Sequence, residues 1–84
     1  METNDETLNS AGPYRIYTPA SLGKAIRHYR LASHLTQADL AIQAGLNRTY
    51  LADLEGGKET EQLKRIFQVL RRLGVRMTLE KADW

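Results

Sequence analysis

The side chains that perform acid–base, nucleophilic or metal chemistry are sparse in this 84-residue sequence. The two histidines, His28 and His34, lie six positions apart and therefore do not share one face of a helix. The sequence contains no cysteine, and its acidic residues lack the spacing of a metal site. Gly56 and Gly57 do not form a phosphate-binding loop. These patterns predict a protein that is not an enzyme and has no cofactor or metal.

Basic side chains are more informative, because they are unevenly distributed along the chain. Residues 13–79 contain eleven Lys and Arg and five Asp and Glu, a net charge of +6, whereas the whole chain carries +2. Residues 1–12 contain three acids and no Lys or Arg. A basic central region favours a polyanionic partner such as nucleic acid, although a surplus of this size is also common on solvated surfaces.

A short helix with clear start and stop signals is predicted at the beginning of the segment Leu35–Lys58 (LTQADLAIQAGLNRTYLADLEGGK). Thr36 followed three residues later by Asp39 has the pattern of a capping box, with the shorter acid in place of Glu. Gly45 supplies the backbone freedom that a helix end needs before a sharp turn. The helix should therefore end at about Ala44.

A second short helix should follow the turn at once. Asn47 is a good N-cap, and Gly56 and Gly57 are typical of a helix end, so we expect a helix over 48–55. Two short helices on either side of a turn that contains glycine are typical of the helix-turn-helix motif, whose second helix enters the major groove of DNA.

Helices are also predicted on both sides of this motif, and a strand after the last of them. Thr18, followed by Pro19 at the first helical position, should cap a helix over 19–33. Thr60 should cap a final helix that Gly74 ends. From 75 to 80 the hydrophobic period changes to two, which predicts a strand.

A single strand in an otherwise helical domain would leave its backbone amides and carbonyls without partners. We therefore expect two chains to pair this strand antiparallel across a homodimer, through Val75, Met77 and Leu79. A small chain without disulfides or metals also needs such support for its modest core. The alternative is a frayed tail whose alternation is accidental.

The predicted organisation is a disordered acidic tail over 1–12, a DNA-binding and dimerisation domain over 13–80, and a short tail over 81–84. No apolar run approaches the roughly 18 residues that a membrane span requires, and the first ten residues do not look like a signal peptide. We therefore expect a cytoplasmic protein with no membrane contact, associated with the nucleoid when it is bound to its operator.

Leu35–Lys58 resembles the Xre/lambda-repressor class of helix-turn-helix proteins, and the likeness covers about 19–74. It implies an all-α domain of four to five helices, here with one C-terminal β-strand. The flanking segments IYTPASLGKAIRHYR and QLKRIFQVLRRLGVRMTLEKADW resemble the HipB antitoxins. This second resemblance implies a homodimer that represses its own operon at a palindromic operator and binds a HipA-like serine/threonine kinase toxin.

The resemblance also assigns roles to individual residues. It places four residues on the side of the recognition helix that faces the DNA bases: Arg48, Thr49, Ala52 and Asp53. It makes four others candidates for contact with DNA phosphates: Gln37, Asn47, Tyr50 and Lys58. For each of them the plain alternative is an exposed residue on a solvated helix.

Three further residues receive roles from the resemblance. Arg30 and Glu55 match positions that form a structural ion pair between the first helix and the end of the recognition helix. Trp84 matches a terminal tryptophan that docks on the kinase, and a large aromatic side chain suits a partner's pocket. Two alternatives to the antitoxin stay open. One is a generic Xre-type repressor or controller protein without a toxin, and the other is a protein-interaction module that uses this scaffold.

Overall fold

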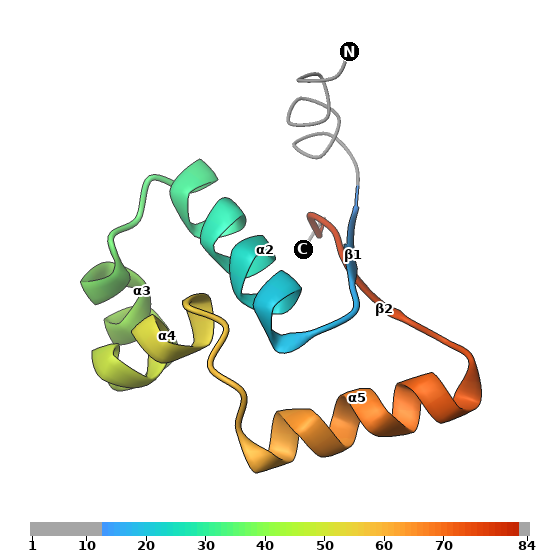
Figure 1. Cartoon of the computed structure of the whole chain (residues 1–84). Coiled ribbons are helices and arrows are strands. Elements are labelled where there is room, and N and C mark those ends of the chain that lie inside the picture. Colours follow the sequence, from blue (N-terminus) through green and yellow to red (C-terminus); the bar gives the residue numbers. More distant parts are fainter. Residues whose placement is uncertain (1–12, 83–84) are drawn as a thin grey trace.

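The computed structural model describes residues 13–82, which contain four helices and a two-stranded sheet (Figure 1). The elements follow one another in the order β1 (Tyr14–Ile16), α2 (Pro19–Ala32), α3 (Gln37–Ala44), α4 (Arg48–Glu55), α5 (Glu61–Leu73) and β2 (Met77–Leu79). The helix bounds agree with the predicted ranges to within one residue. The mainly helical fold and the four helices are therefore confirmed for this part of the chain.

The helix starts have the local chemistry that the sequence predicts. Thr36 Oγ1 accepts a hydrogen bond from the Asp39 amide at 3.0 Å, and Asp39 Oδ2 accepts one from the Thr36 amide at 3.0 Å. The bond from the Thr36 amide to the Asp39 carboxylate, helped by the Thr36 side chain, holds the pKa of Asp39 below its ordinary value. Thr18 and Thr60 accept from amides in the first turns of α2 and α5. Each entry point is therefore set by residues close in sequence.

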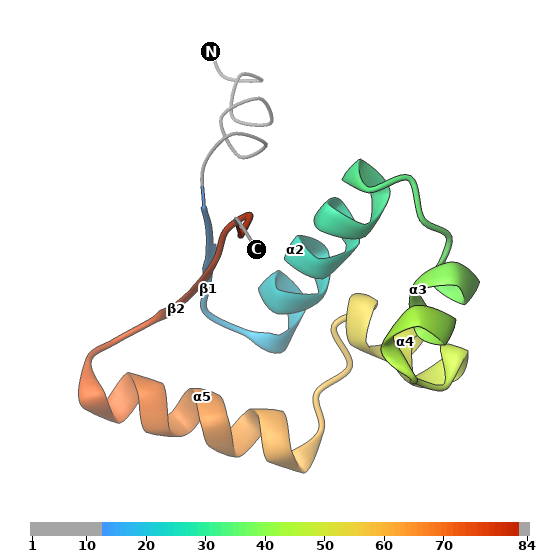
Figure 2. The same ribbon diagram turned by 180° about the vertical axis from the view of Figure 1, so that it is seen from behind.

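The two strands form one antiparallel sheet within the chain. Ile16 lies opposite Met77, and Tyr14 lies opposite Leu79. Figures 1 and 2 both show β1 and β2 side by side, although about sixty positions separate them in sequence. The prediction that the C-terminal strand has no partner in its own chain is therefore wrong. It failed because β1 has only three residues, too few for a pattern of alternation.

The sheet closes one side of the hydrophobic core. The core consists of Ile16, Leu22, Ala25 and Phe67, with Met77 and Leu79 among the half-buried side chains packed against it. The chain's own core therefore uses two of the three side chains that were assigned to a dimer. The third, Val75, precedes the strand, which is shorter than predicted, and 51% of its surface is exposed. Intersubunit pairing through these residues stays a prediction.

Gly23 lets α2 lie directly against the end of α4. A Cβ atom at this position would lie 2.4 Å from the Leu54 carbonyl oxygen and 2.6 Å from that of Glu55. Real Cβ atoms do not approach carbonyl oxygens so closely, so the two backbones can touch only with glycine here. This contact fixes the position of α4, and no local sequence pattern predicts it.

None of the helices within residues 13–82 combines the length and apolar character needed to cross a membrane. Two predictions concern residues outside this range. They are the disordered acidic tail over 1–12 and the contact made by Trp84.

Candidate nucleic-acid interface

Helices α3 and α4 form the helix-turn-helix unit, and their N-termini contribute to one surface. Leu51 and Glu55 are the buried residues of α4. On its other side, Arg48, Thr49 and Ala52 line a shallow hollow together with Gln37, the first residue of α3. The structure thus brings together three of the four predicted base-contacting residues and one predicted phosphate-contacting residue.

The chemistry of this surface suits a DNA duplex. Arg48 is exposed at the first position of α4, where its guanidinium could donate two hydrogen bonds to O6 and N7 of a guanine. Thr49 beside it carries both a methyl group for a thymine and a hydroxyl for a base edge. The N-terminal ends of α3 and α4 also carry the partial positive charge of a helix dipole, which attracts phosphates, while the amides of Asp39, Thr49 and Tyr50 already donate to the caps. The surface can therefore both read bases and hold the backbone.

Asp53 and Lys58 lie apart from this hollow and pair with each other. Lys58 Nζ lies 3.4 Å from Asp53 Oδ2, and both side chains are about half exposed. Together with Tyr50 they line a separate small cavity between α4 and the start of α5. The pair partly neutralises the Lys58 charge, so Lys58 offers a phosphate less than a free cation would. The roles assigned to these three residues stay predictions.

The side-chain oxygen of Asn47 caps the N-terminus of α4. Its Oδ1 accepts from the Thr49 amide at 2.7 Å and from the Tyr50 amide at 3.4 Å. This confirms the predicted N-cap. The cap leaves the Nδ2 group of Asn47 able to donate to a phosphate oxygen.

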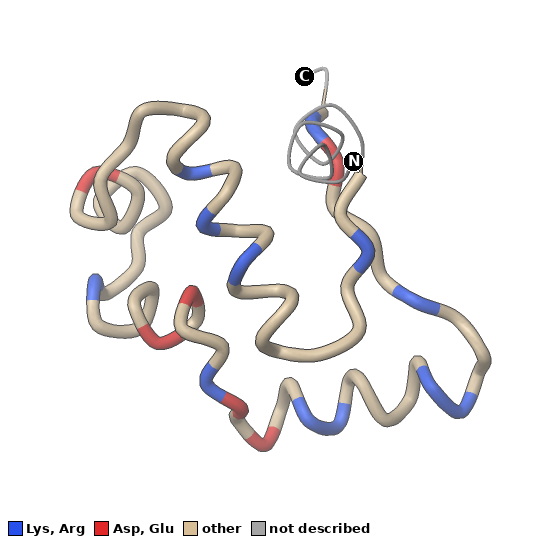
Figure 3. Tube along the Cα trace, turned by 45° about the horizontal axis from the view of Figure 1, so that its top comes forward, with Lys and Arg blue, Asp and Glu red and all other residues tan. Residues whose placement is uncertain are grey.

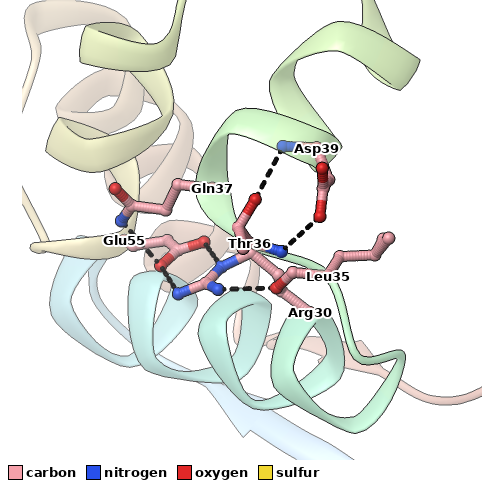
Figure 4. A network of polar contacts seen from close by, with 6 residues as sticks. All are labelled: Arg30, Leu35, Thr36, Gln37, Asp39 and Glu55. Atoms are coloured by element: carbon pink, nitrogen blue, oxygen red, sulfur yellow. Dashed lines mark hydrogen bonds and ion pairs between the residues drawn. The ribbon is translucent and has the colours of Figure 1, made fainter.

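A buried ion pair fixes the end of α4 to α2 (Figure 4). Arg30 Nε donates to Glu55 Oε2 at 2.6 Å, and Nη2 donates to Oε1 at 2.9 Å. Only 8% of the Arg30 side chain and 3% of the Glu55 side chain are exposed. Arg30 Nη1 also donates to the Leu35 carbonyl oxygen at 2.8 Å. The ion pair that the family resemblance implied is therefore confirmed, and it also secures the loop before α3.

Gln37 connects this ion pair to the exposed surface. Its Nε2 donates to Glu55 Oε1 at 3.1 Å (Figure 4). The same side chain lines the hollow beside Arg48. The family resemblance predicts only a phosphate contact for Gln37. Its bond to a residue 18 positions away has no signature in the sequence.

The electrostatics of the network keep both partners charged. The hydrogen bond from Arg30 lowers the pKa of the Glu55 carboxyl below its ordinary value, outweighing the opposite effect of burial, and the bond from Gln37 lowers it further. The Glu55 carboxylate in turn raises the pKa of Arg30. At neutral pH the pair is therefore ionised.

The positive charge of the central region lies mostly outside the two motif helices (Figure 3). Helices α3 and α4 carry one cation, Arg48, and three acids, Asp39, Asp53 and Glu55. Lys and Arg residues are instead spread over α2, α5, β1 and the segment just before β2. Within residues 13–82 no cluster of His, Asp and Glu side chains could hold a metal ion. Arg48 is thus the one cation that the two motif helices carry.

Known proteins are similar in sequence to more than half of this chain. The chain is 43% identical over 60 residues to an uncharacterized HTH-type transcriptional regulator of Sinorhizobium fredii, y4mF, which corresponds to 71% of this chain and 79% of the relative. This chain belongs to the HTH-type transcriptional regulators. The arrangement of α3 and α4 and the similarity to an HTH-type regulator thus both support the predicted helix-turn-helix motif.

Two other relatives of this HTH regulator cover a similar region. It is 35% identical over 52 residues to a regulator of Methanocaldococcus jannaschii, MJ0272, or 62% of this chain and 79% of that protein. It is 37% identical over 54 residues to the control protein C.BamHI of Bacillus amyloliquefaciens, or 63% of this chain and 67% of that protein. No protein-family model and no solved structure matches the chain.

Proposed function

We propose that this regulator binds double-stranded DNA and represses transcription, with α4 in the major groove. The proposal rests on the surface that Arg48, Thr49 and Gln37 share. Gln37 donates a hydrogen bond to Glu55, which forms a buried ion pair with Arg30. Its relatives are named as transcriptional regulators and as a control protein. The repressor would act in the cytoplasm, on the nucleoid, and would perform no enzymatic reaction.

The operator is proposed to be a palindrome bound by a homodimer. One eight-residue helix reaches only a few base pairs, and each good base contact contributes about 1–3 kcal/mol of discrimination. Two copies related by a two-fold axis double the number of contacts. Their half-sites would lie about 34 Å apart, one turn of the duplex.

Replacing Arg48 by alanine should weaken specific binding by about 1–3 kcal/mol and relax the preference at one base pair in each half-site. Gln37→Ala should instead weaken binding to all duplexes to a similar degree, because phosphate contacts carry no sequence information. Fluorescence anisotropy at fixed salt would measure this, with one duplex selected from a randomised library and one scrambled duplex.

Arg71→Ala is the matched control for Arg48→Ala, because it removes the same side chain from an exposed position on α5. It should change binding much less. Unchanged affinity of Arg48→Ala for both duplexes would show that this face of α4 does not contact bases. Failure to select any duplex from the library would favour a protein-interaction module on this scaffold.

The antitoxin of a HipBA-type operon is the second candidate function. The segments that resemble HipB at the two ends of the chain, IYTP and MTL, come together in the structure, where Ile16 of β1 lies opposite Met77 of β2. A surface composed of these segments could bind a HipA-like kinase toxin. The relatives support the generic repressor at least equally well, because they are named as regulators and a control protein.

If the antitoxin proposal holds, a chain that ends at Lys81 should keep DNA binding and lose kinase binding. It keeps every described helix and strand, so its affinity for the selected duplex should stay unchanged. Without Trp84 it should retain a HipA-like kinase at least about tenfold less well, as loss of an aromatic anchor predicts. A pull-down with both chains measures this. Equal retention would mean that Trp84 makes no contact with the kinase.

A further inference from the structure

Arg27 lies on the side of α2 that packs against the end of α4. It follows Gly23 by four positions and precedes Arg30 by three, and residues at these intervals share one face of a helix. A Cβ atom at Gly23 would lie 2.6 Å from the Glu55 carbonyl oxygen, and Arg30 forms an ion pair with the Glu55 carboxylate. Arg27 is therefore flanked on α2 by two residues that both contact Glu55.

The Arg27 guanidinium is a positive charge that no acid balances. The residue is exposed, and within residues 13–82 it forms no hydrogen bond or ion pair. Both carboxylate oxygens of Glu55 already accept hydrogen bonds from Arg30, and one of them accepts from Gln37 as well. The pKa of the Glu55 carboxyl is lowered mainly by the bond from Arg30 and also by the charge of Arg27, as a nearby cation does. Since Arg30 neutralises Glu55, Arg27 adds a net positive charge beside the pair.

Gln37 connects this place to the surface of the helix-turn-helix unit. Its Nε2 donates one hydrogen to Glu55 Oε1 at 3.1 Å, and an amide nitrogen has a second hydrogen for another acceptor. Gln37 is also the first residue of α3, where the helix dipole favours an anion, and it lines the hollow beside Arg48. Arg27 and Gln37 therefore both lie beside Glu55, one on α2 and the other on α3.

A DNA backbone needs more positive charge than the two motif helices provide. Helices α3 and α4 carry three acids beside the single cation Arg48. Affinity for DNA depends largely on cations that neutralise phosphates, which follow one another about every 3.4 Å of helix axis along each strand. In the proposed function Arg48 contacts a base, so a phosphate near Gln37 can be neutralised only by a cation from another element. Arg27 is the arginine of α2 that has no acid to neutralise.

We propose that Arg27 of α2 and Gln37 of α3 form a phosphate clamp, which holds the backbone of one DNA strand beside the groove that α4 enters. The Arg27 guanidinium donates to one phosphate, and the second Nε2 hydrogen of Gln37 donates to a neighbouring phosphate. The duplex therefore lies across the middle of α2 as well as over α3 and α4. This inference rests on the proposed function, and it adds α2 to the DNA-binding surface.

The test compares variants of Arg27 in fluorescence anisotropy with the selected and the scrambled duplex. Arg27→Glu places a carboxylate against a phosphate, so the affinity for both duplexes should fall at least about tenfold, while the preference between them stays the same. Arg27→Ala should reduce the slope of log affinity against log salt concentration by about 1 for each chain bound. Arg27→Lys keeps the charge and should keep the wild-type slope.

Arg71→Glu is the matched control, because it makes the same change at an exposed arginine near the end of α5. Figures 1 and 2 show this end of α5 on the far side of the fold from α3. The affinity for either duplex should change by less than about threefold, since salt screens distant charges. Arg27→Ala should shift the melting temperature by no more than about 4 °C, because Arg27 is exposed and has no partner among the described residues.

The outcomes separate the phosphate clamp from the proposed function. Weaker binding of both duplexes by Arg27→Glu, with wild-type affinity in Arg71→Glu, supports the clamp. Equal affinities of Arg27→Glu and wild type for a duplex overturn the clamp and leave the proposed function intact. A loss of preference between the duplexes in Arg27→Ala also overturns it, because Arg27 would then contact a base. If the wild type binds neither duplex, the proposed function and the clamp both fail.

Discussion

Replacing Glu55 by alanine should lower the free energy of unfolding by about 3–5 kcal/mol, the usual cost of breaking a buried ion pair. Arg30 would keep its charge in a site where 8% of its side chain is exposed, with only the Leu35 carbonyl left as a hydrogen-bond partner. Gln37 would lose its partner too. Urea denaturation followed by circular dichroism measures the change.

The control is a solvent-exposed ion pair that joins Asp53 of α4 to Lys58, which follows the helix. Asp53→Ala removes the partner of Lys58, and because both side chains are about half exposed the cost should stay below about 1 kcal/mol. Replacing Arg30 by methionine and Glu55 by leucine together should cost less than Glu55→Ala alone, since no charge is then left unpaired. Equal stability of Glu55→Ala and wild type would show that the pair contributes nothing to the fold.

The same pair should make stability depend on pH under acidic conditions. The pKa of Glu55 lies below its ordinary value of 4.5 in the folded state. A carboxyl with a depressed folded pKa contributes stability that is fully present above the unfolded pKa and is lost as pH falls through the folded one. The free energy of unfolding of the wild type should therefore decrease as the pH drops below about 4.5. In the variant that lacks both charged groups, this part of the loss should be absent.

Replacing Gly23 by alanine should destabilise the fold by about 2–3 kcal/mol, although alanine is the better helix former by about 1 kcal/mol. The new methyl group would lie within 2.6 Å of two carbonyl oxygens of α4, and these atoms cannot move without shifting the helix. The shift would displace Arg48 and Thr49 relative to α3. We therefore expect weaker DNA binding as well as a lower melting temperature.

Gly56→Ala is the matched control, because it adds the same methyl group to a glycine in ordinary helical conformation, φ −77°. Its nearest neighbour would be the Ala52 carbonyl oxygen at 3.3 Å, so the change in stability should stay within about 1 kcal/mol. Equal effects of the two substitutions would show that the closeness of α2 and α4 is not what Gly23 permits.

The sequence by itself determined the features that depend on neighbouring residues. Each helix start follows from a cap within three positions, as Thr36 and Asp39 illustrate, and Gly45 ends α3 with φ +70°. The hydrophobic period identified α5 and the region of β2. Asn47 is the N-cap of α4, so it likewise predicts Arg48 as the first residue of that helix. These interactions join groups that are close in sequence, so they depend little on how the rest of the chain packs.

Only the tertiary structure decided the features that join distant segments. β1 became visible through its pairing with β2, since three residues carry no period of their own. The requirement for glycine at position 23 arises from the α4 backbone, about thirty positions away. Arg30 and Glu55 were paired beforehand only by family resemblance, and the bond from Gln37 to Glu55 was not foreseen. The physical reason is that backbone contact and burial depend on how elements pack, which no local pattern encodes.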